Sequence, residues 1–133
     1  MEKFDELPFE FKNSKNNGEK LRIIQELVPG RQITLAHIIA NPDNILYKKL
    51  GLDPRLDYSH AAIGIITISP SETAIIAADI CTKASAAEIG FVDRFSGTLL
   101  MTGSVSDVEA SVRAILDYAE NTLSFSVCKI TKT

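Results

Sequence analysis

Residues Ala61–Gly103 have the sequence AAIGIITISPSETAIIAADICTKASAAEIGFVDRFSGTLLMTG, which combines dense apolar content with clear element boundaries. Ala62–Ile68 is nearly all aliphatic and rich in β-branched residues, which predicts a strand buried on both faces. Two more short apolar runs, Glu88–Asp93 and Thr98–Thr102, are separated by Arg94–Gly97, whose glycine can adopt a positive φ. We therefore expect these two runs to form an antiparallel hairpin.

A helix is expected between the first strand and the hairpin. Ser69, Pro70 and Glu72 have the order of N-cap, N1 and N3 residues. The helix is therefore predicted to begin at Pro70 and to run to about Ala84. Its predicted apolar face consists largely of small residues, which allow close packing on a sheet: Ala74, Ile75, Ala77, Ala78, Ile80, Cys81 and Ala84.

Two elements are expected before this stretch. Arg31–Ile39 predicts a strand, and the residues assigned to its apolar face are Ile33, Leu35, His37 and Ile39. Asn41-Pro42 favours the start of a short helix, Pro42–Leu50, which Gly51 would end from the C′ position.

A long helix and a last strand are expected after the hairpin. Ser104 can cap the helix with Asp107 three residues on. Apolar residues then recur at three- and four-residue steps, at Val105, Val108, Val112, Ile115, Leu116 and Ala119. Ser124–Thr131 alternates and then slips phase at Ile130, which predicts a strand with a bulge or an irregular end.

The order of elements from Ala62 is βαββαβ, preceded by an additional strand and short helix. Right-handed crossovers then give an antiparallel sheet with two helices on one face. The predicted fold is α+β in two layers: a ferredoxin-like core with an added N-terminal strand and β-α unit. Such a core supports many unrelated functions and does not indicate one.

The composition favours one compact domain. The chain has 133 residues, of which 45% are hydrophobic and 23% are charged, and a formal net charge of −3. Without clustered Lys and Arg, we expect no nucleic-acid or anionic-membrane partner. The sequence contains no apolar run long enough to span a bilayer, and its acidic start does not resemble a secretion signal, so a cytoplasmic location is expected.

The residues that could carry chemistry do not form a recognisable catalytic, metal or cofactor motif. His37 is interpreted as a hydrogen-bonded structural residue and His60 as a solvated loop residue. Cys81 and Cys128 are interpreted as reduced core thiols. The best acid–base candidates are Asp79, Glu88, Asp93 and Arg94, which mostly fit surface roles. We therefore expect neither an enzyme nor a bound cofactor or metal.

The N-terminal segment divides into two parts. Met1–Lys20 is polar and aperiodic and is interpreted as a flexible tail; a docking motif built on Phe9 and Phe11 is the alternative. Leu21–Val28 is ambiguous between helix and strand, and is stopped by Pro29-Gly30. As a strand it has two mixed faces, which suggests pairing with another strand, such as a copy of itself.

Four strings resemble a known family: Ile23–Pro42 (IIQELVPGRQITLAHIIANP), Ala62–Ala84 (AIGIITISPSETAIIAADICTKA), Ile89–Glu109 (IGFVDRFSGTLLMTGSVSDVE) and the terminal CKITKT. They are similar to the circularly permuted shell proteins of bacterial microcompartments, especially the propanediol-utilisation and ethanolamine-utilisation types. The resemblance covers Leu21–Thr133, which would be a single permuted domain.

The resemblance implies a flat homohexamer that tiles with other shell proteins around encapsulated enzymes. It also implies that six copies of the preceding strand form a small barrel over the six-fold axis and cap the central pore. The barrel residues would be Leu21, Arg22, Ile23, Ile24, Gln25, Glu26, Leu27 and Val28.

The resemblance also implies roles for two sites. The AADICTK string places Lys83 at the hexamer edge, where it would meet a neighbouring hexamer; by itself, Lys83 reads as a solvated lysine in the last turn of a helix. The turn residues Phe95, Ser96 and Gly97 would lie near the pore, in a loop shorter than that of unpermuted members. The tail and the loop Asp53–Ser59 are longer than the family pattern, and either could alter one face or dock cargo.

Three functions from different classes remain at this stage, and a small enzyme that depends on Asp79, Asp93 or His37 ranks last. The first is a non-catalytic structural shell protein, with possible cargo peptides among its partners. The alternative is a regulatory module that binds a small molecule between subunits on a ferredoxin-like fold.

Overall fold

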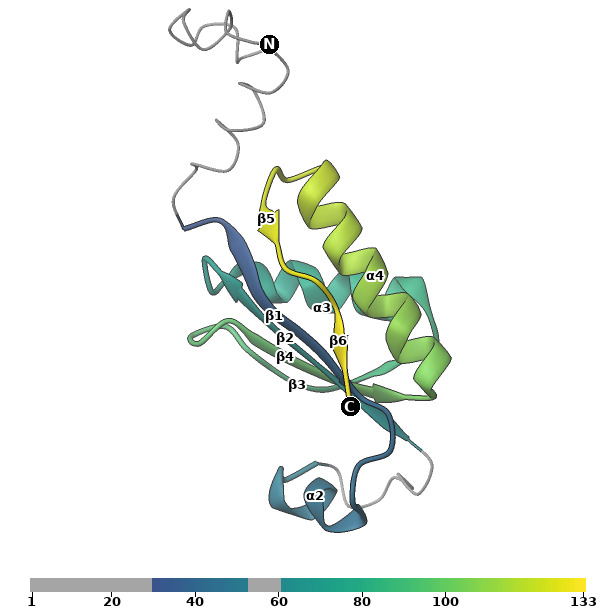
Figure 1. The fold of residues 1–133 in the computed structure, drawn as a ribbon. Coiled ribbons are helices and arrows are strands. Elements are labelled where there is room, and N and C mark those ends of the chain that lie inside the picture. Colours follow the sequence, from purple (N-terminus) through teal and green to yellow (C-terminus); the bar gives the residue numbers. More distant parts are fainter. Residues whose placement is uncertain (1–29, 53–60) are drawn as a thin grey trace, which may run out of the picture.

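The computed structural model describes residues 30–52 and 61–133 (Figure 1). Its elements are β1 (Gln32–Ile39), α2 (Asn44–Lys49), β2 (Ala62–Ser69), α3 (Thr73–Ala84), β3 (Glu88–Asp93), β4 (Thr98–Gly103), α4 (Val105–Asn121), β5 (Ser126–Val127) and β6 (Thr131–Lys132). The predictions for the tail Met1–Lys20, for Leu21–Val28 and for the loop with His60 lie outside the described residues.

One sheet organises the molecule, with the strand order β3-β4-β2-β1-β5 and with β6 also paired to β1. Neighbouring pairs are antiparallel except that β5 and β6 run parallel to β1. The expectation of a wholly antiparallel sheet is therefore wrong at this edge. The added strand β1 lies between β2 and the C-terminal strands, so a last strand that runs antiparallel to β2 must run parallel to β1.

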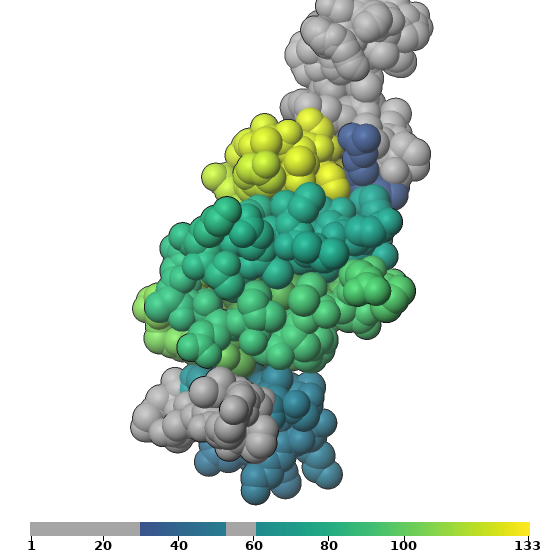
Figure 2. All heavy atoms as spheres, turned by 180° about the vertical axis from the view of Figure 1, so that it is seen from behind, coloured from purple at the N-terminus to yellow at the C-terminus, as the bar shows by residue number. Residues whose placement is uncertain are grey.

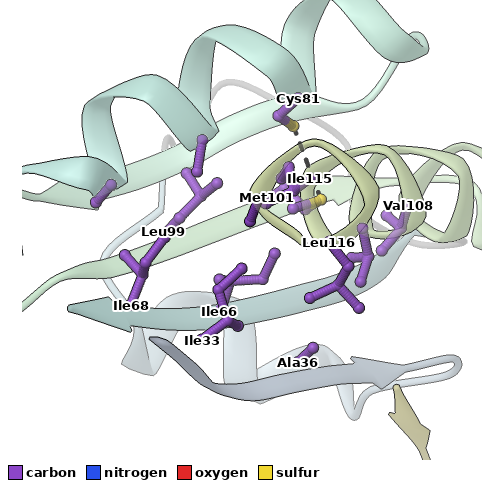
Figure 3. Packing of buried hydrophobic residues seen from close by; sticks show 14 of the residues in the cluster. Ile33, Ala36, Ile66, Ile68, Cys81, Leu99, Met101, Val108, Ile115 and Leu116 are labelled. Carbon is purple, nitrogen blue, oxygen red and sulfur yellow. Dashed lines mark hydrogen bonds between the residues drawn. The ribbon is translucent and has the colours of Figure 1, made fainter. Parts of the chain in front are cut away.

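The helices α3 and α4 cover one face of this sheet, which confirms the predicted two-layer α+β architecture (Figure 1). Side chains from β1, β2 and β4 meet those of the two helices in the main core, which Figure 3 shows around Ile66, Leu99 and Met101. A smaller cluster on the opposite face packs Tyr47 and Leu52 against Ile63 and Leu100. Tyr47 of α2 and Leu52, which follows this helix, therefore cover only part of that second face.

The apolar face predicted for β1 is wrong because the strand contains a bulge. The pairing of β1 with β2 shifts register between Ile33 and Leu35. The extra residue turns the following side chains to the other face. Ile33, Ala36 and Ile38 therefore enter the main core, whereas Ile39 packs against the smaller cluster.

The predicted starts of two helices are also wrong. Ser69 is still paired with Gln32 in the sheet, and α3 begins only at Thr73, with no side-chain cap from Glu72. In the other helix the cap is Asp43, whose carboxylate accepts a 3.1 Å hydrogen bond from the Ile45 amide, and not Asn41.

The C-terminal end of α2 and the start of α4 follow the sequence signals more closely. Gly51 has a φ of 71° and donates to Lys48, while Leu52 donates to Tyr47, which is the bonding pattern of a Schellman C-cap. Ser104 caps α4 as predicted, since its hydroxyl accepts from the Asp107 amide at 3.1 Å. The predicted last strand is divided into β5 and β6 by residues 128–130.

Candidate functional site

The turn between β3 and β4 is built around one carboxylate. Asp93 Oδ1 accepts hydrogen bonds from the Phe95 amide at 2.9 Å and from the Ser96 amide at 3.4 Å. Its Oδ2 accepts from the Ser96 hydroxyl at 3.0 Å. The Phe95 amide is the largest cause that holds the pKa of the Asp93 carboxyl below its ordinary value, because these bonds favour the charged form.

Gly97 closes this turn in a conformation that favours glycine. Its φ is 77°, its amide donates to the Asp93 carbonyl at 2.9 Å, and its carbonyl accepts from the Ile68 amide at 2.8 Å. A β-carbon at Gly97 would overlap the Ile68 carbonyl oxygen. The turn is therefore fixed both within the hairpin and against the end of β2.

Phe95 projects from this fixed turn. Its side chain is highly exposed, and the Arg94 guanidinium lies 4.6 Å from the ring centroid, which is a cation–π distance. The hairpin (green) ends in this projecting turn, which is seen from behind in Figure 2. An exposed aromatic side chain on an ordered support suits a contact with another molecule better than it suits catalysis.

Lys83 lies in the last turn of α3 with its side chain exposed. Its ammonium group is 2.9 Å from a carboxylate oxygen of Asp79, one helical turn earlier. An exposed ion pair of this kind contributes little to stability, so the lysine is available for contacts at the surface. The placement of Lys83 at an edge between hexamers stays a prediction.

The remaining candidates have local structural partners. Each ring nitrogen of His37 hydrogen-bonds a threonine hydroxyl, Nδ1 with Thr131 at 2.5 Å and Nε2 with Thr133 at 2.9 Å. This agrees with the structural interpretation of His37. Cys81 and Cys128 are free thiols, and burial raises the pKa of each.

The acid–base candidates do not share a common role. Asp79 pairs with Lys83 on α3, Asp93 orders its own turn, and Glu88 is exposed at the start of β3. The described residues 30–52 and 61–133 contain no group of three His, Cys, Asp or Glu side chains that could hold a metal. In the same ranges, no helix is long and apolar enough to cross a membrane.

Sequence reasoning missed two exposed apolar residues beside the turn. Ile75 on α3 and Val92 on β3 line a hollow of about 210 Å³ together with Asp93, Arg94 and Phe95. The prediction that Ile75 lies on the buried apolar face of α3 is wrong, because its side chain is 52% exposed. Sequence alone does not separate a core position from an exposed position at the margin of an apolar stripe. The available signal was the set of large apolar residues that flank Asp93 and Arg94, with Phe91 and Val92 before them and Phe95 after them.

Comparisons with known proteins match this fold to one family. Residues 62–131 match the family described as the BMC domain. The bacterial microcompartment shell protein PduU of Salmonella typhimurium is 52% identical over 112 residues, which cover 84% of this chain and 93% of PduU. The shell protein EutS of Escherichia coli is 46% identical over 115 residues, which cover 86% of this chain and 99% of EutS.

A solved structure described as the CutR flat hexamer, form 1, is also similar. It superposes with a TM-score of 0.73 at 47% sequence identity, over 81% of this chain and 95% of the CutR chain. The family inferred from the sequence strings is thereby confirmed. With more than half of the chain matched by the family and most of its length matched by these relatives, the chain belongs to the BMC-domain family of bacterial microcompartment shell proteins.

Proposed function

We propose that the chain is a structural tile of a microcompartment shell, which forms cyclic homohexamers that pack with other shell proteins. The observation that carries this proposal is the likeness to the CutR flat hexamer, which extends over 95% of the CutR chain at 47% identity. Relatives named as shell proteins, rather than enzymes, support a non-catalytic role. The tile would lie in a shell within the cytoplasm.

In this hexamer, Phe95, Ser96 and Gly97 lie near the central axis. The support is physical: the turn is the projecting end of the hairpin, and its backbone is held by Asp93 and by the end of β2. Six copies of an ordered turn can define an opening of constant size, whereas six mobile loops cannot. The turn would therefore set the width of the ring at its centre.

Leu21–Val28 forms a six-stranded barrel that caps this opening. The described chain begins at Gly30, and the next strand starts where Gln32 pairs with Ser69. The adjoining Ile68 amide binds the carbonyl of Gly97. Gln32 and the turn therefore lie at the same end of the sheet, so a proposed barrel strand just before Gly30 would join the domain beside the proposed axis.

The mass of the purified protein in solution tests the hexamer. Six copies of the 14.5 kDa chain give about 87 kDa by light scattering after size exclusion. A monomer or dimer at all concentrations would overturn the tile and favour the regulatory module, which would then show saturable stabilisation by a metabolite. A shortened chain that begins at Gly30 should remain hexameric if Leu21–Val28 only caps the ring.

Barrel formation has its own readout. Electron microscopy of the full chain should show density over the six-fold axis that is absent from the chain shortened to Gly30. The same axial density in both proteins, or in neither, would contradict the barrel without affecting the hexamer.

Replacing Lys83 by glutamate tests the contact between hexamers. The Lys83→Glu variant should keep the hexamer mass and lose extended sheets in electron micrographs, because the edge contact changes sign. Lys49→Glu, which makes the same charge change on α2, is the control. Loss of hexamers in Lys83→Glu, or equal loss of sheets in the control, would contradict the assignment of Lys83.

A further inference from the structure

The sheet face opposite the helices carries apolar side chains outside its buried cluster. Leu35 is 39% and Phe91 is 38% exposed, and Ile65, on a strand between theirs, is only partly buried. An antiparallel sheet face that stays in water normally carries polar side chains at such positions. We call this surface the open face and define it as Leu35, Ile65, Thr67, Phe91 and Thr98. Clustered apolar side chains of this kind mark a contact surface.

The strand register joins these side chains into one surface. One row of paired residues runs through Leu35, Thr67 and Thr98. In the next row, Phe91 and Ile65 are both paired with a residue of β4 that belongs to the smaller cluster. Directly paired residues lie on the same side of a sheet. The open face is therefore continuous across β1, β2, β4 and β3.

The open face lies at the end of the sheet where the described chain begins. β1 starts at Gln32, whose partner Ser69 is two residues beyond Thr67. α2 follows the other end of β1 and lies beyond that end of the sheet (Figure 1). A segment that precedes Gly30 would therefore join the domain beside the open face, whereas α2 contributes cover at the far end.

The segment Leu7–Phe11, with the sequence LPFEF, has a pattern that suits such a face. Although the tail as a whole has no regular period, Leu7, Phe9 and Phe11 are large apolar residues at every second position. In an extended chain, alternate side chains point to the same side. Pro8 has no amide hydrogen for strand pairing, so the segment is better suited to packing its side chains on a face than to extending a sheet edge.

We propose that Leu7–Phe11 packs its apolar side chains on the open face of the same chain. The 18 residues 12–29 join this segment to Gly30 and can span up to about 60 Å. If Leu21–Val28 forms the proposed barrel strand, residues 12–20 alone still span up to about 30 Å, which exceeds the length of the eight-residue β1. The docking does not require the proposed hexamer.

The polar groups of the open face are compatible with an apolar cover. Thr67 shares a 2.8 Å hydrogen bond with the hydroxyl of Thr34. Thr98 shares a 3.0 Å hydrogen bond with the hydroxyl of Ser96. Covering these threonines would therefore leave neither hydroxyl without a partner. Removal of apolar surface from water on both the segment and the face drives the contact.

A tryptophan reporter tests the docking, because the chain contains no tryptophan. In the full chain with Phe9→Trp, the emission should be shifted to the blue relative to the same protein unfolded in urea, and acrylamide should quench it weakly. Asn16→Trp, in the same tail but outside the alternating run, is the matched control and should emit as a solvent-exposed residue in both conditions. Equal exposure of the two reporters in the folded protein would overturn the docking.

Substitutions on the sheet identify the site. Adding Leu35→Asp or Phe91→Asp to Phe9→Trp should shift the emission to the red, because a carboxylate is costly to cover with apolar side chains. Ile45→Asp places the same charge at an exposed apolar residue of α2, outside the open face, and should leave the emission unchanged. A blue-shifted reporter that responds to neither open-face variant would be buried elsewhere, which overturns the proposed site.

Cross-linking gives a second readout that does not depend on the aspartate variants. Phe9→Cys and Phe91→Cys would be combined with Cys128→Ser and treated with a short bismaleimide; Cys81 is fully buried and should not react. A link within one chain, identified by mass spectrometry of the linked peptides, is expected. Asn16→Cys in place of Phe9→Cys should give much less of it. Links between chains instead would place the segment on another copy, which overturns the assignment to the same chain.

The native mass separates this docking from the proposed function. A hexamer whose Phe9→Trp reporter is exposed overturns the docking and leaves the tile standing. A monomer or dimer whose reporter is buried, and responds to the open-face variants, overturns the tile and leaves the docking standing. A mass of two hexamers that falls to one hexamer in Phe91→Asp would show that the open faces of two rings pack together, which also overturns the docking.

Discussion

The two faces of the sheet differ in how fully the described chain covers them. On the helical face, α3 and α4 enclose a continuous core that includes Ile66, Met101 and Ile115. On the opposite face, the described buried cluster is smaller and consists of Tyr47 and Leu52 packed against Ile63 and Leu100. Leu35 and Phe91 remain exposed there, although both belong to strands.

This difference indicates which face stabilises the single chain and which face is available for contacts in an assembly. Burial of apolar area stabilises a single chain, so the covered helical face accounts for most of its stability. A sheet face with partial cover leaves apolar strand residues available for contacts outside the described core. Substitutions on the two faces should therefore affect stability unequally.

The largest expected difference in the loss of stability is between substitutions at two neighbouring residues of β2. Ile66 is fully buried under the helices, whereas Ile65 packs at the border of the smaller cluster. Ile66→Ala should lower the free energy of unfolding by about 2–5 kcal/mol, through lost burial and a cavity. Ile65→Ala should cost less than half as much. Urea unfolding at one fixed protein concentration measures both, and equal losses would contradict the comparison.

Two glycines sharpen the same comparison. A β-carbon at Gly64 would lie 2.7 Å from Val108 Cγ1 and 2.9 Å from Met101 Cγ, in the core of the helical face. At Gly90 it would lie 2.6 Å from Leu100 Cδ2, the end of a flexible side chain. Because the β-branched Val108 has little rotamer freedom, Gly64→Ala should cost about 1–3 kcal/mol.

Gly90→Ala should cost less, because the end of Leu100 can rotate away and Leu52 lies farther off. Thermal unfolding of the two variants at the same protein concentration shows which substitution lowers the stability more. A lower midpoint for Gly90→Ala than for Gly64→Ala would show that the smaller cluster is packed as rigidly as the main core.

The sequence signals predicted local structure best where one side chain decides it. Ser104 has no competing partner in the sheet and caps α4 as expected. Ser69 carries an equally good cap signal, but its backbone is used by the pairing with Gln32, and α3 begins later. Long-range pairing therefore overrode a local signal.

The bulge in β1 illustrates the same limit. No glycine or proline marks the register shift between Ile33 and Leu35, because the shift is set by pairing with β2. Site prediction was limited in another way. The special roles of Lys83 and Phe95 were inferred from the family resemblance. The hollow beside the turn became apparent only when the structure placed Ile75 beside Val92.

The helix caps provide a smaller test of the two faces. Ser104 caps the 17-residue α4 over the main core, and Asp43 caps the six-residue α2 on the opposite side. Ser104→Ala should lower the global free energy of unfolding by about 1 kcal/mol. Asp43→Ala should instead speed local amide exchange in α2, because a short helix with few core contacts opens by itself. An equal global loss from both would contradict this division.

The smallest expected effect is at Asp93, in the turn between β3 and β4 at one end of the sheet. Hydrogen bonds, led by the Phe95 amide, lower the pKa of this carboxyl in the folded chain. A lowered folded pKa means that the stabilising contribution is present above the unfolded value of about 4 and is lost as pH falls through the folded value. NMR titration of the carboxyl should therefore give a pKa below that of an unfolded chain.

The Asp93→Asn variant tests the same contribution through stability. Its amide oxygen can still accept from the Phe95 amide, so the turn should form, but the uncharged side chain no longer responds to acid. The loss of stability between neutral pH and pH 3 should accordingly be smaller in the variant than in the unsubstituted chain. If both chains lose stability equally over this range, the bonds to Asp93 order the turn without distinguishing the charged carboxylate from its neutral form.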